Sequence, residues 1–250
     1  MTDVPAAKEG DPREDAGAKV IAPPHVRHRR AGVFEAYVLL ASVGFVVTGI
    51  LAHTIGYFPV DLTFTRSIQT ITSPAFGHLM RGVSWFGFIP QVDILGGTCL
   101  VGLFLAGLRW EAVSGLFAGL GVLLGSLIKL IVARPRPSLD LVHVASRIDS
   151  SGFPSGHVLM VTAFYGFLTF LGYTLLKESW QRTGLLVLFS FLIVLMGLSR
   201  IYLGHHWFSD VMGAYVLGSL WLALTIRVYR WGKTRFFVGQ PVAPEPESRP

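Results

Sequence analysis

Six long apolar stretches separated by polar segments dominate the chain. They cover approximately residues 36–56, 88–108, 112–132, 157–176, 183–200 and 210–228. A helix needs roughly 20 apolar residues to cross the hydrocarbon core of a bilayer. Strands of a membrane barrel would be about half as long and would alternate polar with apolar positions. The pattern therefore predicts an all-α fold, a bundle of six transmembrane helices.

The composition agrees with a membrane protein. Apolar residues make up 52% of the 250 residues and charged residues only 14%, and the mean hydropathy is +0.55. Because soluble proteins carry roughly 25% charged residues, an ordinary soluble enzyme is excluded, and so is a disordered chain. The single cysteine, Cys99, lies in an apolar stretch and excludes both an intramolecular disulfide and a cysteine metal cluster.

Two longer polar segments interrupt the predicted bundle. Residues 57–87 mix apolar and polar positions, which predicts one or two short helices lying at the membrane interface. Residues 133–156 contain Pro135 and Pro137, followed by Ser, Asp and Gly, which predicts a loop.

The distribution of Lys and Arg predicts the orientation. Residues 1–33 are polar and predict a disordered cytoplasmic tail, residues 34–232 the six-span domain, and residues 233–250 a cytoplasmic C-terminal tail. Of the 21 Lys and Arg residues, 14 lie in these tails, at the end of the last span (Arg227 and Arg230) and in the short segments 109–111 and 177–182, and seven lie on the other side. Since cationic loops stay in the cytoplasm, both termini are expected inside.

Residues capable of phosphate chemistry gather in three segments on the outer side. The segments are KLIVARPRP, PSGH and SRIYLGHHWFSD, which begin at residues 129, 154 and 199. They supply three cations, Lys129, Arg136 and Arg200, suited to a tetrahedral oxyanion. Ser155 and Gly156 open a helix, whose free N–H groups attract anions. These residues predict a pocket for phosphate.

Two histidines add an acid and a nucleophile to this pocket. His206 and Asp210 are four residues apart, so they share one face of a helix, and a carboxylate on one ring nitrogen frees the other to attack. His157 belongs to another helix and can act as a general acid near neutral pH. The spacing predicts phosphoryl transfer with no metal and no cofactor.

The order K-x6-R-P, P-S-G-H and S-R-x5-H-x3-D resembles the three-part signature of the type-2 phosphatidic acid phosphatase superfamily. The signature spans residues 129–210, and the helix layout extends the likeness over about 35–230. The resemblance implies that His206 forms a phosphohistidine, that Asp210 orients it, and that His157 protonates the leaving group. It also implies that phosphate is held by Lys129, Arg136, Ser155, Gly156 and Arg200.

The resemblance further implies a multi-pass enzyme of the cell membrane, surrounded by membrane lipids, with its active site on the extracytoplasmic face. Expected substrates are phosphatidic acid, phosphatidylglycerophosphate, lipid A phosphates, or isoprenoid diphosphates such as undecaprenyl diphosphate. The net charge of +6 reflects topology and one anion pocket, so no nucleic-acid partner is expected.

Three alternatives stay open at this point. A lipid phosphotransferase would use the same residues with an alcohol in place of water. Vanadate-dependent haloperoxidases resemble the same signature, because vanadate mimics phosphate, but they are soluble and larger. A transporter or scaffold would need the cations but not the arrangement of acid and base.

Several residues have two interpretations each. Arg134 is either an auxiliary phosphate or headgroup ligand or a solvated loop charge, and Arg200 could merely extend to the interface. His205 is interpreted as a rim residue, and Asp93 as either a site residue or a hydrogen-bonding group between helices. His143, Arg147 and Asp149 could contact a headgroup or lie in an exposed loop. Glycines within the apolar stretches are interpreted as helix-packing positions, among them Gly96, Gly97, Gly115 and Gly119.

Overall fold

The computed structural model describes residues 24–88 and 90–237, and every element assigned in them is helical. Contacts divide the chain into two units after Leu40. In the first unit, the described residues 24–40 form the first part of helix α2 (Pro24–Thr54). The remainder of α2 and all other elements belong to the second unit. The predicted all-α fold is confirmed.

The two predicted tails lie partly outside the described residues. Residues 1–23 of the N-terminal tail and 238–250 of the C-terminal tail are among those not described. Helix α2 begins at Pro24 and so extends into the segment predicted as tail. Proline suits the first helical turn because it has no N–H to leave unpaired. The C-terminal segment begins with a π-helical turn, η1 (Lys233–Phe237).

Five stretches of the described chain are long and apolar enough to cross a membrane: Arg29–Thr54, Arg109–Val132, Gly156–Leu175, Trp180–Tyr202 and Phe208–Phe236. The first lies within α2, and the other four contain α6 (Arg109–Gly119) with α7 (Gly121–Val132), α8 (Gly156–Leu175), α9 (Trp180–Tyr202) and α10 (Phe208–Gly232).

The sixth predicted span forms the shorter apolar helix α5 (Gln91–Leu105). Its 15 residues extend about 22 Å at 1.5 Å per residue, against a hydrocarbon core of about 30 Å. Pro90 precedes the helix, and Gly107, with φ +81°, follows its end. The count of six full spans is therefore not confirmed.

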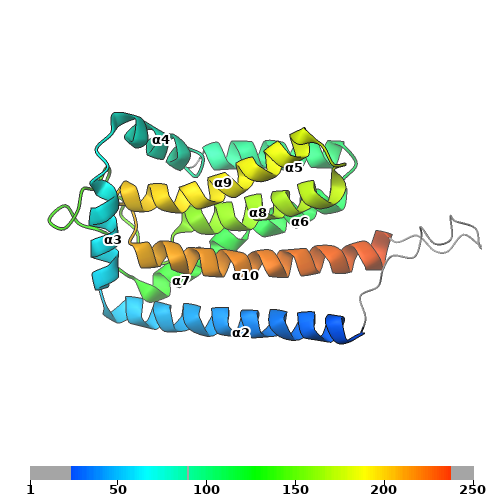
Figure 1. Ribbon diagram of the computed structural model, residues 1–250, viewed down its shortest axis with the longest axis horizontal. Helices are drawn as coiled ribbons and strands as arrows, with labels where there is room; N and C mark the ends of the chain where they lie inside the picture. Colours follow the sequence, from blue (N-terminus) through cyan, green and yellow to red (C-terminus); the bar gives the residue numbers. More distant parts are fainter. Residues whose placement is uncertain (1–23, 89, 238–250) are drawn as a thin grey trace, which may run out of the picture. The chain divides into compact units, whose positions relative to one another are not determined.

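Two short helices fill the segment predicted to hold one or two. They are α3 (Pro59–Gln69) and α4 (Pro74–Trp85), and each begins with proline. At the start of α3, the Asp61 carboxylate accepts the Phe58 backbone N–H at 2.9 Å, which satisfies a donor at the helix end. Helix α3 packs against α9 and α10 and crosses their ends (Figure 1).

Helix α8 is the central element of the second unit. It packs against α6, α7, α9 and α10, and most of its residues are buried. Close approach depends on glycines of its neighbours, since a Cβ added at Gly218 of α10 would lie 2.8 Å from the Thr162 side chain. Because α8 begins at Gly156, this packing fixes His157 at the end of the core.

The loop between α7 and α8 is held against the ends of the bundle. Ala133 ends α7 in the left-handed conformation, with φ 47°. Further along, Gln69 of α3 donates to the His143 carbonyl at 2.8 Å and accepts its N–H at 3.1 Å. The Ala145 N–H donates to the Leu203 carbonyl at 3.0 Å. The predicted loop therefore has a defined path over the helix ends.

Candidate active site

The structure brings all eight predicted site residues together where the ends of α7, α8, α9 and α10 meet. Six of them line one cavity of about 1030 Å³: Lys129, Arg136, Gly156, His157, Arg200 and His206. The other two lie next to this wall, where the Ser155 backbone N–H donates a 3.2 Å hydrogen bond to the Asp210 carbonyl.

The same cavity continues as an apolar groove between α5, α6, α7 and α8. Its walls there include Val92, Leu100, Leu116, Leu120, Val122 and Phe164. Gly97 and Gly119 also line the groove, and a Cβ added at either would meet nothing within 4 Å. Their interpretation as helix-packing positions is wrong, because the missing side chains leave open space instead of a helix contact.

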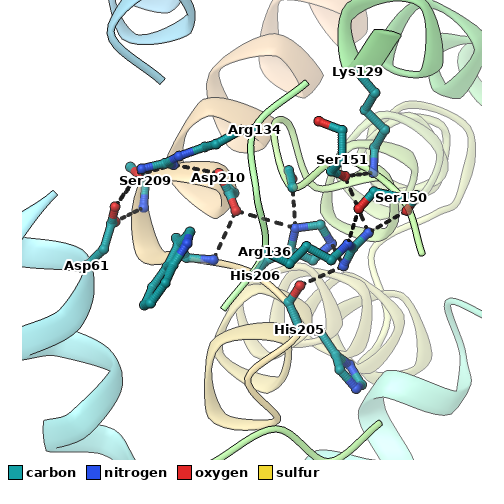
Figure 2. Close-up of polar contacts among 12 residues, drawn as sticks. Asp61, Lys129, Arg134, Arg136, Ser150, Ser151, His205, His206, Ser209 and Asp210 are labelled. Carbon is teal, nitrogen blue, oxygen red and sulfur yellow. Dashed lines mark hydrogen bonds and ion pairs between the residues drawn. The ribbon is translucent and has the colours of Figure 1, made fainter. Parts of the chain in front are cut away.

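His206 is buried, and its Nδ1 is held by a backbone carbonyl. Nδ1 donates a 2.8 Å hydrogen bond to the Gly152 carbonyl, which can only accept, so the lone pair lies on Nε2 (Figure 2). Asp210 Oδ2 lies 3.6 Å from Nδ1, longer than a hydrogen bond. The Gly152 carbonyl, which sequence reasoning could not identify, thus takes the hydrogen bond expected for Asp210.

Arg136 covers the other ring nitrogen. Its Nη1 donates to His206 Nε2 at 3.1 Å and to the His205 carbonyl at 2.6 Å, while its Nε donates to the Ser150 carbonyl at 2.6 Å. Burial, and next the positive charges of Arg136 and Arg200, hold the pKa of His206 well below its ordinary value. Burial also lowers the pKa of Arg136. The His206 ring is therefore neutral, as a nucleophile requires.

The cavity wall carries buried polar groups that no residue of the described chain satisfies. They are Arg200 Nε and Nη2, Ser151 Oγ and His157 Nε2, and Ser155 Oγ next to the wall is also without a partner. Arg200 is fully buried, so it does not extend to the interface, and its Nη1 donates to Ser84 Oγ at 2.6 Å. Lys129 Nζ donates to the Ser151 carbonyl at 3.1 Å. Since buried polar groups are normally paired, this cluster is suited to a tetrahedral oxyanion.

His157 is held between aromatic and glycine neighbours at the start of α8. Its ring packs edge-on against Phe88 at a centroid distance of 4.9 Å. A Cβ added at Gly87 would lie 2.6 Å from His157 Cδ2, so only glycine leaves room for the ring. No motif in the sequence marks Gly87 as a residue of this site.

His205 faces a second, polar cavity of about 310 Å³, which Arg147 and Asp149 also line. Its Nε2 hydrogen-bonds Ser146 Oγ at 2.9 Å. Burial and the nearby guanidinium of Arg200 lower the pKa of His205 to about 3. His205 is buried and does not line the main cavity, so its interpretation as a neighbour or rim residue stays a prediction. Asp93 and Asp149 line the main cavity, which favours the site alternative for Asp93.

Both interpretations of Arg134 are wrong. Its side chain is buried and forms ion pairs with Asp61 at 2.8 Å and with Asp210 at 2.6 Å (Figure 2). Arg134 is thus neither a phosphate ligand nor a solvated charge. The two arginines of the R-P-R-P run diverge, because Arg136 reaches the cavity while Arg134 reaches behind His206. Asp61 gave no signal in the sequence beyond a charge near the start of a short helix.

Within residues 24–88 and 90–237, no group of three or more His, Cys, Asp or Glu side chains could hold a metal ion. Metal independence stays a prediction.

Comparison with known proteins identifies the family. A family model described as the PAP2 superfamily matches residues 110–233, a range that contains all eight predicted site residues. The chain belongs to the PAP2 superfamily. Phosphatidylglycerophosphatase B of Bacillus subtilis is 28% identical to this PAP2 protein over 186 residues, which cover 70% of this chain and 86% of the relative. A dihydrosphingosine 1-phosphate phosphatase of Schizosaccharomyces pombe is 33% identical over 131 residues, or 50% of this chain and 30% of that protein.

Two solved structures have a similar fold. The PAP2-type phosphatidylglycerolphosphate phosphatase of Bacillus subtilis superposes with a TM-score of 0.68 and 25% identity, over 80% of this chain and 98% of its own. LpxE of Aquifex aeolicus superposes with a TM-score of 0.53 and 22% identity, over 69% of this chain and 98% of its own, and supports the fold alone. With its five apolar spans, this PAP2 protein is a membrane phosphatase, a phosphoric-ester hydrolase.

Proposed function

We propose that this PAP2 protein hydrolyses a lipid phosphomonoester through a phosphohistidine on His206. The supporting observation is the cavity, which joins two chemically different ends. One end combines the neutral His206 ring with cations and unpartnered donors, which suits a phosphate dianion. The other end is an apolar groove, which suits a lipid chain.

The names of the relatives favour a phosphomonoester. One is a phosphatidylglycerophosphatase and another a dihydrosphingosine 1-phosphate phosphatase. Phosphatidylglycerophosphate is therefore the first substrate to test. Phosphatidic acid, lipid A phosphates and isoprenoid diphosphates such as undecaprenyl diphosphate are the alternatives that the same assay separates.

The first chemical step transfers the phosphoryl group to His206. Its Nε2 lone pair forms a bond to phosphorus, and the electrons of the breaking P–O bond pass to the lipid oxygen. His157 donates a proton to that oxygen, which leaves as an alcohol. Lys129, Arg136 and Arg200, with Ser155 and the Gly156 N–H, hold the phosphoryl oxygens.

The second step reverses the roles of the two histidines. His157, now neutral, takes a proton from water while the water oxygen bonds to phosphorus. The electrons of the N–P bond return to His206 Nε2, and inorganic phosphate leaves. With three cations compensating the phosphate charge, we expect full activity in the presence of a metal chelator.

Substrate binding also uncovers the nucleophile in this proposal. Arg136 Nη1 donates to His206 Nε2 in the resting site. A phosphoryl oxygen is a stronger acceptor than the ring nitrogen, so it takes this N–H and frees the lone pair. Phosphate binding and activation of His206 are then one event.

The decisive experiment compares purified wild type with His206→Ala on phosphatidylglycerophosphate in mixed micelles, with release of free phosphate as the readout. Loss of the nucleophile should reduce turnover about 10³-fold or more. His78→Ala, which removes an exposed histidine of α4, should keep wild-type turnover. Unchanged turnover of His206→Ala would sink the mechanism. Recovery of labelled phosphate on an added alcohol, instead of as free phosphate, would favour the phosphotransferase.

We further propose that both termini are cytoplasmic and that the site opens on the extracytoplasmic face of the cell membrane. The excess of Lys and Arg on the side of the two termini supports this orientation. In a Cys99→Ser background, single cysteines at the exposed positions Asp140 and Glu178 can be labelled in intact cells with a membrane-impermeant maleimide. Labelling of Asp140→Cys but not Glu178→Cys is expected, and the opposite pattern would reverse the topology.

A further inference from the structure

A buried polar cluster lies behind His206, and none of its side chains lines the cavity. It consists of Asp61 from α3, Arg134 from the loop after α7, and Ser209 and Asp210 from the start of α10 (Figure 2). The three charged side chains are fully buried. Arg134 Nη2 lies 2.8 Å from Asp61 Oδ2, and its Nη1 lies 2.6 Å from Asp210 Oδ1 and 2.7 Å from Ser209 Oγ.

Hydrogen bonds around the cluster fix both its shape and its charge. Asp61 Oδ1 accepts the Ser209 N–H at 2.7 Å, and Oδ2 accepts the Ser209 hydroxyl and the Phe58 N–H, both at 2.9 Å. Arg134 Nε donates to the Gly56 carbonyl at 3.2 Å, and its guanidinium lies 4.8 Å from the Phe58 ring centre. Every partner of the carboxylates is a donor, so both carboxylates are ionised.

Two carboxylates therefore share one guanidinium, and the cluster has a net charge of −1. Asp210 paired with Arg134 alone would form a neutral pair. Asp61 restores the net negative charge of the cluster, whose Asp210 Oδ2 lies 3.6 Å from Nδ1 of His206. The cavity on the other side of the ring holds three cations. The His206 ring therefore lies between a negatively charged cluster and a positively charged cavity wall.

Arg134 also controls both acceptors that face His206 Nδ1. Its side chain holds Asp210 Oδ1, while the Trp207 N–H holds Oδ2 at 2.9 Å, so Oδ2 is fixed 3.6 Å from Nδ1. Its backbone carbonyl accepts the Gly152 N–H at 2.8 Å, and the Gly152 carbonyl accepts the Nδ1–H. A Cβ at Gly152 would lie 2.9 Å from Asp210 Oδ2, so the two acceptors pack directly together.

We propose that Asp61 and Arg134 are positioning residues for phosphoryl transfer, which makes the short helix α3 part of the catalytic unit. The inference rests on the proposed phosphohistidine. When Nε2 bonds to phosphorus, Nδ1 keeps its proton and the ring becomes cationic. The net negative cluster stabilises that charge, and the charge disappears when the N–P electrons return to Nε2 during attack by water.

The test separates positioning of His206 from binding of phosphate. Asp61→Asn removes one charge with almost no change in side-chain volume, so kcat should fall about tenfold to a hundredfold, the effect typical of an outer hydrogen-bonding partner of an imidazole. The Ki of inorganic phosphate, which needs only the cations of the cavity, should stay within about twofold. The Ki of vanadate, which bonds to the attacking nitrogen, should rise in step with the loss of kcat. Asp140→Asn, which removes an exposed carboxylate outside the cluster, should change none of these values.

Two further variants keep the test decisive. If Asp61→Asn does not fold, Arg134→Lys keeps the charge but not the planar guanidinium. It should raise the Ki of vanadate and leave the Ki of phosphate unchanged, as expected for Asp61→Asn. In an Asp210→Asn background, Asp61→Asn should have little further effect on vanadate binding, because it acts through Asp210.

Three results would overturn the inference. The first is an unchanged kcat in folded Asp61→Asn, the second an equal loss of phosphate and vanadate affinity, and the third additive effects with Asp210→Asn. Absence of phosphatase activity and of vanadate binding in the wild type would instead refute the proposed function.

Discussion

Gly87 offers a way to displace the proposed acid without touching it. In Gly87→Ala, the new Cβ would lie 2.6 Å from His157 Cδ2 and 3.1 Å from Met196 Cε. Carbon atoms in contact prefer about 3.5–4.0 Å, so the ring must move by about 1 Å. The edge-on contact with Phe88 at 4.9 Å limits where it can go. A shift of this size in a catalytic group reduces rate about 10²-fold, or about 2.7 kcal/mol of activation free energy.

The assay compares a lipid phosphate with p-nitrophenyl phosphate, whose leaving group needs little protonation. Gly87→Ala should lose about 10²-fold in kcat on the lipid and clearly less on p-nitrophenyl phosphate, because in the proposed mechanism His157 protonates the leaving oxygen. Gly82→Ala is the matched control, since a Cβ there meets nothing within 4 Å. Wild-type kcat on the lipid for Gly87→Ala, or an equal loss in Gly82→Ala, would refute the reasoning.

Three other predictions concern the groove, the acid limit of stability and the far end of the bundle. Gly119→Leu fills open space in the apolar groove. The KM for a long-chain lipid phosphate should therefore rise about tenfold, while hydrolysis of p-nitrophenyl phosphate stays unchanged. Equal effects on both substrates would contradict a lipid-binding groove. Burial lowers the pKa of His205 from 6.5 to about 3, so the unfolded chain binds this proton first and the melting temperature should fall as pH drops from 6.5 toward 3. His205 should contribute about 1.4 kcal/mol of unfolding free energy per pH unit to this fall, and His205→Gln should remove that contribution. Glu111→Gln removes an ion pair with Lys233 (2.6 Å) at the end of α10 opposite the site. Thermal melting in detergent should show about 1–2 kcal/mol of lost stability, and kcat should not change. A loss of kcat in folded protein would refute this.

The sequence predicted the parts of this molecule that depend on local pattern. Apolar stretches of membrane length located the long helices, and the mixed apolar and polar segment 57–87 located α3 and α4, because both signals are continuous along the chain. The length of α5 was missed because its apolar stretch continues past Gly107, where the backbone turns. Apolar composition does not report where a helix ends.

The sequence likewise identified only some residues of the candidate site. Residues with a side-chain motif, such as His206 and His157, could be chosen before the fold was known. The partners of Arg134 could not, since Asp61 and Asp210 lie 73 and 76 residues away along the chain. The Gly152 carbonyl escaped for another reason, because every residue has a carbonyl and only its position makes it an acceptor for Nδ1.

The contact of Arg136 with His206 Nε2 has a consequence for chemical selectivity. A ring nitrogen whose lone pair is held by a guanidinium reacts poorly with an electrophile that cannot itself engage the guanidinium. Neutral alkylating or acylating compounds dissolved in the bilayer therefore meet a protected histidine. In the proposed mechanism a phosphate dianion binds Arg136 and so removes this protection, which would make His206 reactive only toward an anionic substrate.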